Sequence, residues 1–141
     1  MRYVLDSGVA FKCLVPEADT DKAIRLRDDY LAGVHELLAP DIFPIELTHA
    51  LTRAERQGRV TTVQGALLFR DMLTVLPVRH LSLPLLPRAY EISSFARQGV
   101  YDCLYIALAE REGCELVTAD DRLVKKLKAQ FPFLVPLDSL P

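Results

Sequence analysis

Hydrophobic residues along the chain fall into short unbroken runs and into stretches that repeat every three to four positions. Runs such as 2–6 and 114–118 are typical of buried strands, whereas Leu85, Ala89 and Ile92 recur at the spacing of one helix face. Strands are predicted at 2–6, 36–39, 78–81, 114–118 and 133–136, and helices at 7–15, 21–32, 41–57, 61–76, 85–96, 101–112 and 120–130. Strands that alternate with helices indicate a parallel sheet covered on both faces, so the predicted fold class is α/β.

Polar residues and glycines mark where the predicted helices begin and end. Thr61 and Gln64 form a capping-box pattern, and Asp41 can cap the helix that follows it. The glycines that stand at predicted helix ends, where a left-handed residue is common, are Gly33, Gly58, Gly99 and Gly113. No repeat or break in composition marks a linker, so we expect one domain over residues 1–141.

The composition is that of a globular protein with a substantial core. Of 141 residues, 50% are hydrophobic and 26% are charged. No apolar run approaches the roughly 18–20 residues that a membrane helix needs, and Asp6 falls where a signal peptide is apolar. The three cysteines are an odd number and lie far apart, which disfavours a disulfide framework. We therefore expect a cytoplasmic protein without a membrane span.

Four acidic residues interrupt the hydrophobic pattern. Asp6 ends an apolar strand, and Asp120 lies two residues beyond the end of another. Asp102 is the one charged residue in the apolar stretch 100–109, and Glu46 interrupts an apolar run in the same way. Local helix capping is the alternative role for each of them. Because the carboxyl ends of parallel strands meet at one rim, where α/β proteins bind ligands, we expect the four acids to converge there.

Converging carboxylates indicate a bound cation. Several of them at one site cannot all ionise at neutral pH unless a cation compensates their charge. Oxygen ligands favour Mg²⁺ or Mn²⁺, and the three histidines lack the spacing of a zinc site. A divalent ion on carboxylates lowers the pKa of a bound water and offsets charge on a leaving oxygen. The acids therefore predict metal-dependent hydrolysis of a phosphodiester.

Four stretches of sequence resemble a known family. They are residues 4–7, 44–47, 100–109 and 116–123, and the last two are the most specific. On these stretches the chain resembles the PIN-domain ribonucleases, and most closely the VapC-like toxins of type II toxin–antitoxin pairs. The resemblance covers essentially the whole chain. It implies a three-layer α/β/α fold, with a central parallel sheet of four or five short strands and about seven helices.

The resemblance also implies a Mg²⁺- or Mn²⁺-dependent endoribonuclease. The implied catalytic residues are Asp6, Glu46, Asp102 and Asp120, with Ser7 and Thr118 as supporting hydroxyls. We expect Asp6 and Asp102 to contact the metal most directly, while the other two acids bind it or orient the attacking water. Asp121 is a second acid beside Asp120 and is an alternative ligand. Gly8 departs from the family pattern, which often has Ser or Thr there.

The implied partners are RNA, a second copy in a homodimer, and a small antitoxin protein whose C-terminal arm blocks the active site. Because the net charge is −2, RNA must be held by a local basic patch. The candidate RNA-binding residues are Lys12, Arg53, Arg122 and Lys125. A solvated last helix is the alternative interpretation of Arg122 and Lys125.

The main alternative function is a non-catalytic PIN-like domain that only binds RNA or a protein. The presence of all four acids argues against it. A nuclease specific for DNA structures is disfavoured, because a chain of 141 residues has no room for insertions that grip a junction.

Overall fold

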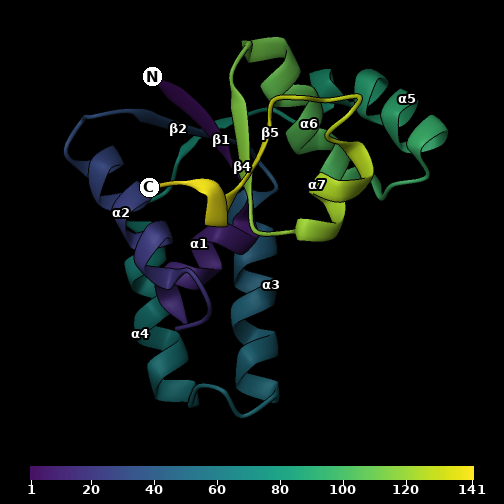
Figure 1. Ribbon diagram of the computed structural model, residues 1–141. Coiled ribbons are helices and arrows are strands. Elements are labelled where there is room, and N and C mark those ends of the chain that lie inside the picture. The colour runs from purple at the N-terminus through teal and green to yellow at the C-terminus, as the bar shows by residue number, and fades with distance from the viewer.

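The computed structural model describes residues 1–141, with a five-stranded sheet that has helices on both faces (Figure 1). The strands are β1 (Arg2–Leu5), β2 (Glu36–Pro40), β3 (Val78–His80), β4 (Glu115–Thr118) and β5 (Leu134–Pro136). The helices are α1 (Ser7–Leu14), α2 (Thr20–Leu31), α3 (Phe43–Arg56), α4 (Thr62–Leu73), α5 (Leu86–Ala96), α6 (Val100–Glu112) and α7 (Asp121–Leu127). The predicted α/β class is confirmed.

All strand pairings in the sheet are parallel, and the strand order is β3-β2-β1-β4-β5. The first strand along the chain is therefore the central one. Val4 of β1 pairs with Leu38 on one side and with Leu116 on the other. Because β1 and β4 are adjacent and parallel, the residues that follow them leave the sheet at the same rim.

Helix α6 forms the centre of the core on one face of the sheet. It packs against β1, β2 and β4, with α5 beside it, and every residue from Cys103 to Ala109 is buried. On the other side of the molecule α1 contacts β4, α2 and α3. Figure 1 shows α3 and α4 projecting away from the sheet as a connected pair. The apolar pattern around Asp102 thus reflects a helix enclosed by neighbours on most sides.

Two predicted helix starts have different outcomes. The capping box is confirmed, because Gln64 N–H donates to Thr61 Oγ1 (3.1 Å) and Thr61 N–H donates to Gln64 Oε1 (2.9 Å). The prediction that Asp41 caps the next helix is wrong. That helix begins at Phe43, and Asp41 Oδ1 instead accepts a hydrogen bond of 3.2 Å from the Ser82 amide. Asp41 therefore ties the end of β2 to the segment after β3.

The left-handed conformation predicted for the glycines at helix ends is confirmed at three of them and wrong at the fourth. The three in the left-handed region are Gly33 (φ 76°), Gly58 (φ 73°) and Gly113 (φ 65°). Gly99 has a φ of −59° and precedes α6 as its N-cap, whereas Arg97 ends α5 with a φ of 55°. The helices predicted to reach 76 and 130 end earlier, at Leu73 and Leu127, and each is followed by a turn.

Cys13, Cys103 and Cys114 are all free, so there is no disulfide framework. None of the helices combines the length and the apolar character needed to cross a membrane.

Candidate active site

Thr118 connects two of the predicted acids at the rim of the sheet. Asp6 follows β1, and its backbone N–H donates to the Val117 carbonyl (3.1 Å), which continues the β1–β4 pairing. Thr118 is the last residue of β4 and is fully buried. Its hydroxyl donates to Asp6 Oδ2 (2.9 Å) and accepts a hydrogen bond from the Asp120 backbone N–H (3.0 Å). Asp6 makes no side-chain cap to α1, so the capping alternative does not account for it.

Glu46 lies in the first turn of α3 and is held from two other helices. The Tyr105 hydroxyl, on α6, donates to Glu46 Oε1 at 2.7 Å. The Ser7 hydroxyl, at the start of α1, donates to the same oxygen at 3.4 Å. No side-chain cap is made at the start of α3, so Glu46 is not a capping-box acid. The carboxylate is instead positioned by tertiary contacts.

Asp102 and Asp120 lie at the starts of α6 and α7. Gln98 Nε2 donates to Asp102 Oδ2 at 2.7 Å, and no protein group donates to the other carboxylate oxygen. Asp120 is the N-cap of α7, where its Oδ1 accepts from the Leu123 amide at 3.1 Å. The local capping role is therefore real for Asp120. Its side chain is also the most exposed of the four, since the other three are partly buried.

The four carboxylates influence one another electrostatically. Burial raises the pKa of Asp6 from 3.8 to about 6 against the opposing hydrogen bond from Thr118, and the charges of Asp102 and Glu46 raise it further. Burial also raises the pKa of Glu46, opposed by the Tyr105 hydrogen bond and reinforced by the charge of Asp102. For Asp102 the pKa rises through burial, and the charge of Asp120 adds to it. The acids therefore form one connected group of like charges, here named the acid cluster.

No basic side chain neutralises the acid cluster. The ion pairs of the protein all use other acids, namely Glu17, Asp28, Glu91, Glu110 and Glu112. No group of three or more histidine, cysteine or acidic side chains is drawn together closely enough to hold a metal ion by itself. Mg²⁺ usually keeps several waters and takes only one or two carboxylates directly. The carboxylates of the acid cluster are oxygen donors of the kind that a hydrated divalent ion takes.

Comparison with known proteins identifies the family. A family model described as the PIN domain matches residues 3–128. Ribonuclease VapC9 of Mycobacterium tuberculosis is 30% identical over 132 residues, which cover 94% of this chain and 96% of that protein. The chain belongs to the VapC group of the PIN domain family. Ribonuclease VapC12 of the same species is 35% identical over 124 residues, covering 86% and 89% of the two chains.

Two solved structures share the fold of this VapC protein. The crystal structure of PAE2754 from Pyrobaculum aerophilum aligns with a TM-score of 0.69 at 22% identity and covers 99% of this chain and 94% of that one. VapBC2 from Rickettsia felis, bound to a DNA fragment from its promoter, aligns with a TM-score of 0.66 at 17% identity and covers 96% and 97%. The PIN-like fold expected from the sequence is confirmed.

The basic residues predicted to bind RNA come from three helices, α1, α3 and α7. Arg122 and Lys125 are exposed on α7, the helix that Asp120 caps. Arg53 is exposed on α3. Lys12 is only 16% exposed and lies 3.5 Å from Glu17 in an ion pair, which leaves it little freedom to contact a phosphate. The α7 pair is thus the basic group closest along the chain to the acid cluster.

Asp121 differs from Asp120 in its surroundings. It is the exposed first residue of α7, and it is not among the charges that raise the pKa of Asp102, whereas Asp120 is. Of the two neighbouring acids, Asp120 is therefore the member of the acid cluster.

Two site residues were missed by the sequence reasoning, Tyr105 and Gln98. Tyr105 lies three residues after Asp102, about one turn along α6. Gln98 precedes α6 and lies four residues before Asp102. The hydroxyl in an otherwise apolar buried helix was a signal that the sequence contained. Nothing in the sequence around Gln98 distinguished it from an exposed loop residue.

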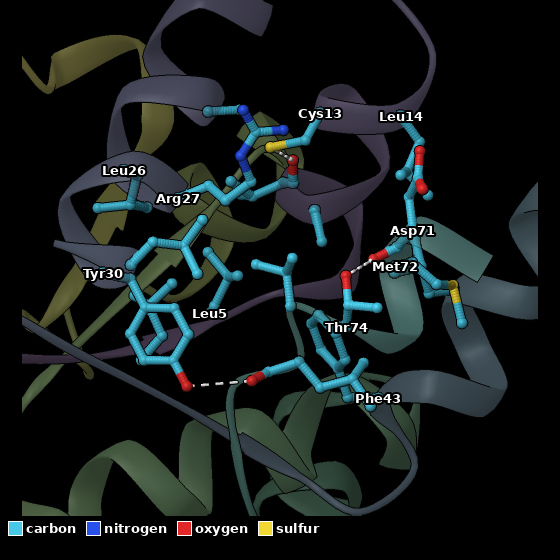
Figure 2. Close-up of a pocket in the computed structure, with 18 residues that line it drawn as sticks. Leu5, Cys13, Leu14, Leu26, Arg27, Tyr30, Phe43, Asp71, Met72 and Thr74 are labelled. Atoms are coloured by element: carbon cyan, nitrogen blue, oxygen red, sulfur yellow. Dashed lines mark hydrogen bonds between the residues drawn. The ribbon is translucent and has the colours of Figure 1, made fainter. Parts of the chain in front are cut away.

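A cavity of this VapC protein is lined by none of the four acids of the acid cluster. It has a volume of about 310 Å³ and is lined mainly by apolar side chains from α1, α2, α3 and the end of α4. In Figure 2 Leu26, Tyr30 and Phe43 surround it, and the Tyr30 hydroxyl donates to the Leu76 carbonyl at 3.0 Å. Leu5 and Leu47 also line the cavity, and they directly adjoin Asp6 and Glu46 along the chain. The cavity and the acid cluster therefore share β1 and α3.

Proposed function

We propose that this protein is a metal-dependent endoribonuclease that hydrolyses RNA phosphodiester bonds as the toxin of a toxin–antitoxin pair, with residues 1–141 forming one nuclease domain. The observation that carries the proposal is the acid cluster, in which the charges of Asp102 and Glu46 raise the pKa of Asp6, the charge of Asp102 raises the pKa of Glu46, and none of the three has a basic partner. The names of the VapC relatives support RNA as the substrate.

The side chains suggest distinct roles. Asp6 and Asp102 would hold Mg²⁺ or Mn²⁺ most directly, with Asp120 beside them. A bound divalent ion would supply a water of lowered pKa and offset charge on the leaving oxygen. Glu46, fixed by Tyr105 and Ser7, would orient the attacking water, and burial raises its pKa, which makes its carboxylate a better proton acceptor.

Other residues support binding of the substrate and the shape of the site. Thr118 fixes Asp6 through its hydroxyl, and Ser7 contributes to holding Glu46. Arg122 and Lys125 contact RNA phosphates from α7, with Arg53 contributing from α3. RNA is then held by a few local cations on a protein whose net charge is −2.

We also propose that a small antitoxin protein inhibits the enzyme by placing an apolar segment in the 310 Å³ cavity. The cavity is lined by residues of α2 and α4 and by Leu5 and Leu47, which adjoin Asp6 and Glu46 along the chain, so a bound segment would contact the strand and the helix next to two acids of the acid cluster. The name of the Rickettsia felis complex, VapBC2, supports a protein partner. The resemblance to VapC-like toxins further favours a homodimer that acts in the cytoplasm.

The proposal is tested with purified protein and a panel of single-stranded RNAs. We expect cleavage in Mg²⁺ or Mn²⁺, loss of cleavage in EDTA, and recovery when Mg²⁺ is restored. Asp6→Asn and Asp102→Asn, shown to be folded by circular dichroism, should cleave at least about 100-fold more slowly. Asp28→Asn, an acid of α2 that pairs only with Arg27, is the matched control and should cleave at the parent rate.

Two results would count against this assignment. If folded Asp6→Asn and Asp102→Asn cleave RNA at the parent rate in Mg²⁺, these residues are not the active site. If the parent protein binds RNA but cleaves none of the panel in either metal, the protein is the non-catalytic binding module instead.

A further inference from the structure

Two side chains that the proposed mechanism does not use connect the helices of the acid cluster. Asp102 belongs to α6, and Asp120 caps α7. Lys126 Nζ, in the last turn of α7, donates to Gln98 Oε1 at 3.1 Å. Gln98 Nε2 in turn donates to Asp102 Oδ2 at 2.7 Å. An unbroken chain of hydrogen bonds therefore runs from α7 through one amide to the Asp102 carboxylate.

The two ends of the Gln98 amide face partners of opposite charge. The amide oxygen can only accept, and it meets the ammonium of Lys126; the amide nitrogen can only donate, and it meets the carboxylate of Asp102. A reversed amide would place oxygen against carboxylate oxygen and N–H against ammonium. Both partners therefore select the same orientation of the amide, and removing either one weakens that selection.

The turn that carries Gln98 is itself held in place. Lys126 Nζ also donates to the Arg97 carbonyl at 2.8 Å, and Arg97 lies in the left-handed region with a φ of 55°. The Ser93 hydroxyl donates to the Gln98 carbonyl at 2.5 Å. A residue other than glycine in this conformation is costly by itself, so the contacts around it must maintain the turn. Lys126 thus fixes both the backbone and the side chain that reach Asp102.

We propose that Gln98 and Lys126 are positioning residues of the active site: Lys126 fixes the Gln98 amide, the amide fixes the orientation of the Asp102 carboxylate, and together they hold the Asp102 and Asp120 carboxylates at the spacing that binds the divalent ion. This inference rests on the proposed function, in which Asp102 and Asp120 are metal ligands. Groups that orient a metal ligand commonly change metal affinity by about 10–100-fold when they are removed.

The test measures metal binding separately from catalysis. Binding of Mn²⁺ alone is followed by electron paramagnetic resonance of the free ion, with no RNA present. We expect Gln98→Leu to weaken Mn²⁺ binding about tenfold or more, and Lys126→Met to weaken it several-fold. In RNA cleavage the same variants should need a correspondingly higher Mg²⁺ concentration for half-maximal rate, while the rate at saturating Mg²⁺ stays within about threefold of the parent.

The double variant tests whether the two residues act in series. Because Lys126 acts through Gln98, Gln98→Leu combined with Lys126→Met should bind Mn²⁺ no more weakly than Gln98→Leu alone. Lys126→Arg keeps a cationic donor and should recover most of the affinity that Lys126→Met loses. Two variants are the matched controls. Gln130→Leu changes an exposed glutamine beyond α7, and Lys22→Met removes the hydrogen bond from the Lys22 ammonium to the Asp138 carbonyl. Both controls should bind Mn²⁺ as the parent does.

Three outcomes overturn parts of this scheme and can be told apart. If folded Gln98→Leu and Lys126→Met bind Mn²⁺ as tightly as the parent while Asp102→Asn does not, the positioning role is wrong and the proposed active site stands. If the two single effects multiply in the double variant, the residues act independently and the series is wrong. If Asp102→Asn itself binds Mn²⁺ like the parent, the metal-ligand assignment fails, and this inference fails with it.

Discussion

The hydroxyl of Tyr105 donates a 2.7 Å hydrogen bond to Oε1 of Glu46, between residues 59 positions apart in sequence. Tyr105 is buried on α6, and burial raises the pKa of its hydroxyl well above the usual range, so it remains a donor. The bond therefore stabilises the charged form of Glu46 at every pH at which the protein is folded.

Replacing Tyr105 by Phe should shift the pH dependence of RNA cleavage. Without the hydrogen bond the pKa of Glu46 rises further, so the acidic limb of the pH–rate profile should move up by about one pH unit, and the rate on that limb should fall by up to about tenfold. The profile between pH 5 and pH 8 is the measurement. Tyr90→Phe, an exposed tyrosine on α5, is the control. An unchanged profile for Tyr105→Phe would show that Glu46 does not limit the rate.

Replacing Thr118 by Val should lower stability and activity together. Valine keeps the shape but removes the hydroxyl, which leaves Asp6 without its donor and the Asp120 amide without its acceptor. We expect a loss of about 1–3 kcal/mol in the free energy of unfolding, measured with urea. Thr118→Ser keeps the hydroxyl and should preserve both hydrogen bonds. Equal losses for the two variants would mean that the methyl group, not the hydroxyl, matters at this position.

The metal-free protein should become less stable as pH rises through the range in which Asp6 titrates. In the folded state the pKa of Asp6 is about 6, against an ordinary value of 3.8, so the folded state holds the proton more tightly than the unfolded state. The free energy of unfolding in EDTA should therefore fall between about pH 4 and pH 7, by up to about 3 kcal/mol from this group. Urea unfolding of the parent and Asp6→Asn measures it, since the variant should lack this part of the slope. Parallel curves would contradict the burial of an ionisable Asp6.

Gly8 is the position at which the chain departs from the family pattern, and serine should be accepted there. A Cβ at Gly8 would lie 3.5 Å from Asp6 Oδ2, an ordinary contact distance. A serine hydroxyl at Gly8 can donate to Asp6, so Gly8→Ser should lower the pKa of Asp6 and reduce the pH dependence of stability in EDTA. Gly8→Ala adds the methyl group alone and controls for helix propensity, which favours both variants over glycine by about 0.5–1 kcal/mol. Identical pH dependence for the two variants would exclude the hydrogen bond.

A charge at the edge of the cavity should weaken binding of the antitoxin. Leu31 lines the cavity and is 59% exposed, so Leu31→Arg should fold normally. We expect at least a tenfold rise in the Kd for the small protein that co-purifies with the parent from its native cell. Val34→Arg, at a residue 64% exposed and outside the cavity, is the control. Equal affinity for both variants would place the partner elsewhere on the surface.

The sequence predicted the main acids of the site because each one interrupts a pattern that burial alone requires. Asp102 is the clearest example. It is the one charged residue in the stretch 100–109, and the structure buries every residue of that stretch from Cys103 to Ala109. Periodicity identifies which face of a helix is buried but not which polar atom on another helix meets it. The partners Tyr105 and Gln98 therefore emerged only when α6 was placed against α3 and α7.

Two local signals were wrong for the same reason. Asp41 and Gly99 satisfy the local rules for a helix cap and for a left-handed helix end, yet other groups decide their roles. The Ser82 amide donates to the Asp41 carboxylate, and Lys126 donates to the carbonyl of Arg97, the left-handed residue that follows α5 at Ala96. Local signals fail where a residue distant in sequence supplies the stronger hydrogen bond.

The parallel pairing of β1 with β4 has a consequence for the protein during its own synthesis. Asp6 is made among the first residues, but Thr118 and Asp120 reach it only after β4 has emerged and paired with β1. Before that point the growing polypeptide contains Asp6, Glu46 and Asp102 but lacks Thr118 and Asp120. The cavity assigned to the antitoxin is lined only by residues 5–76, so all of its lining is synthesised before the last acid of the acid cluster.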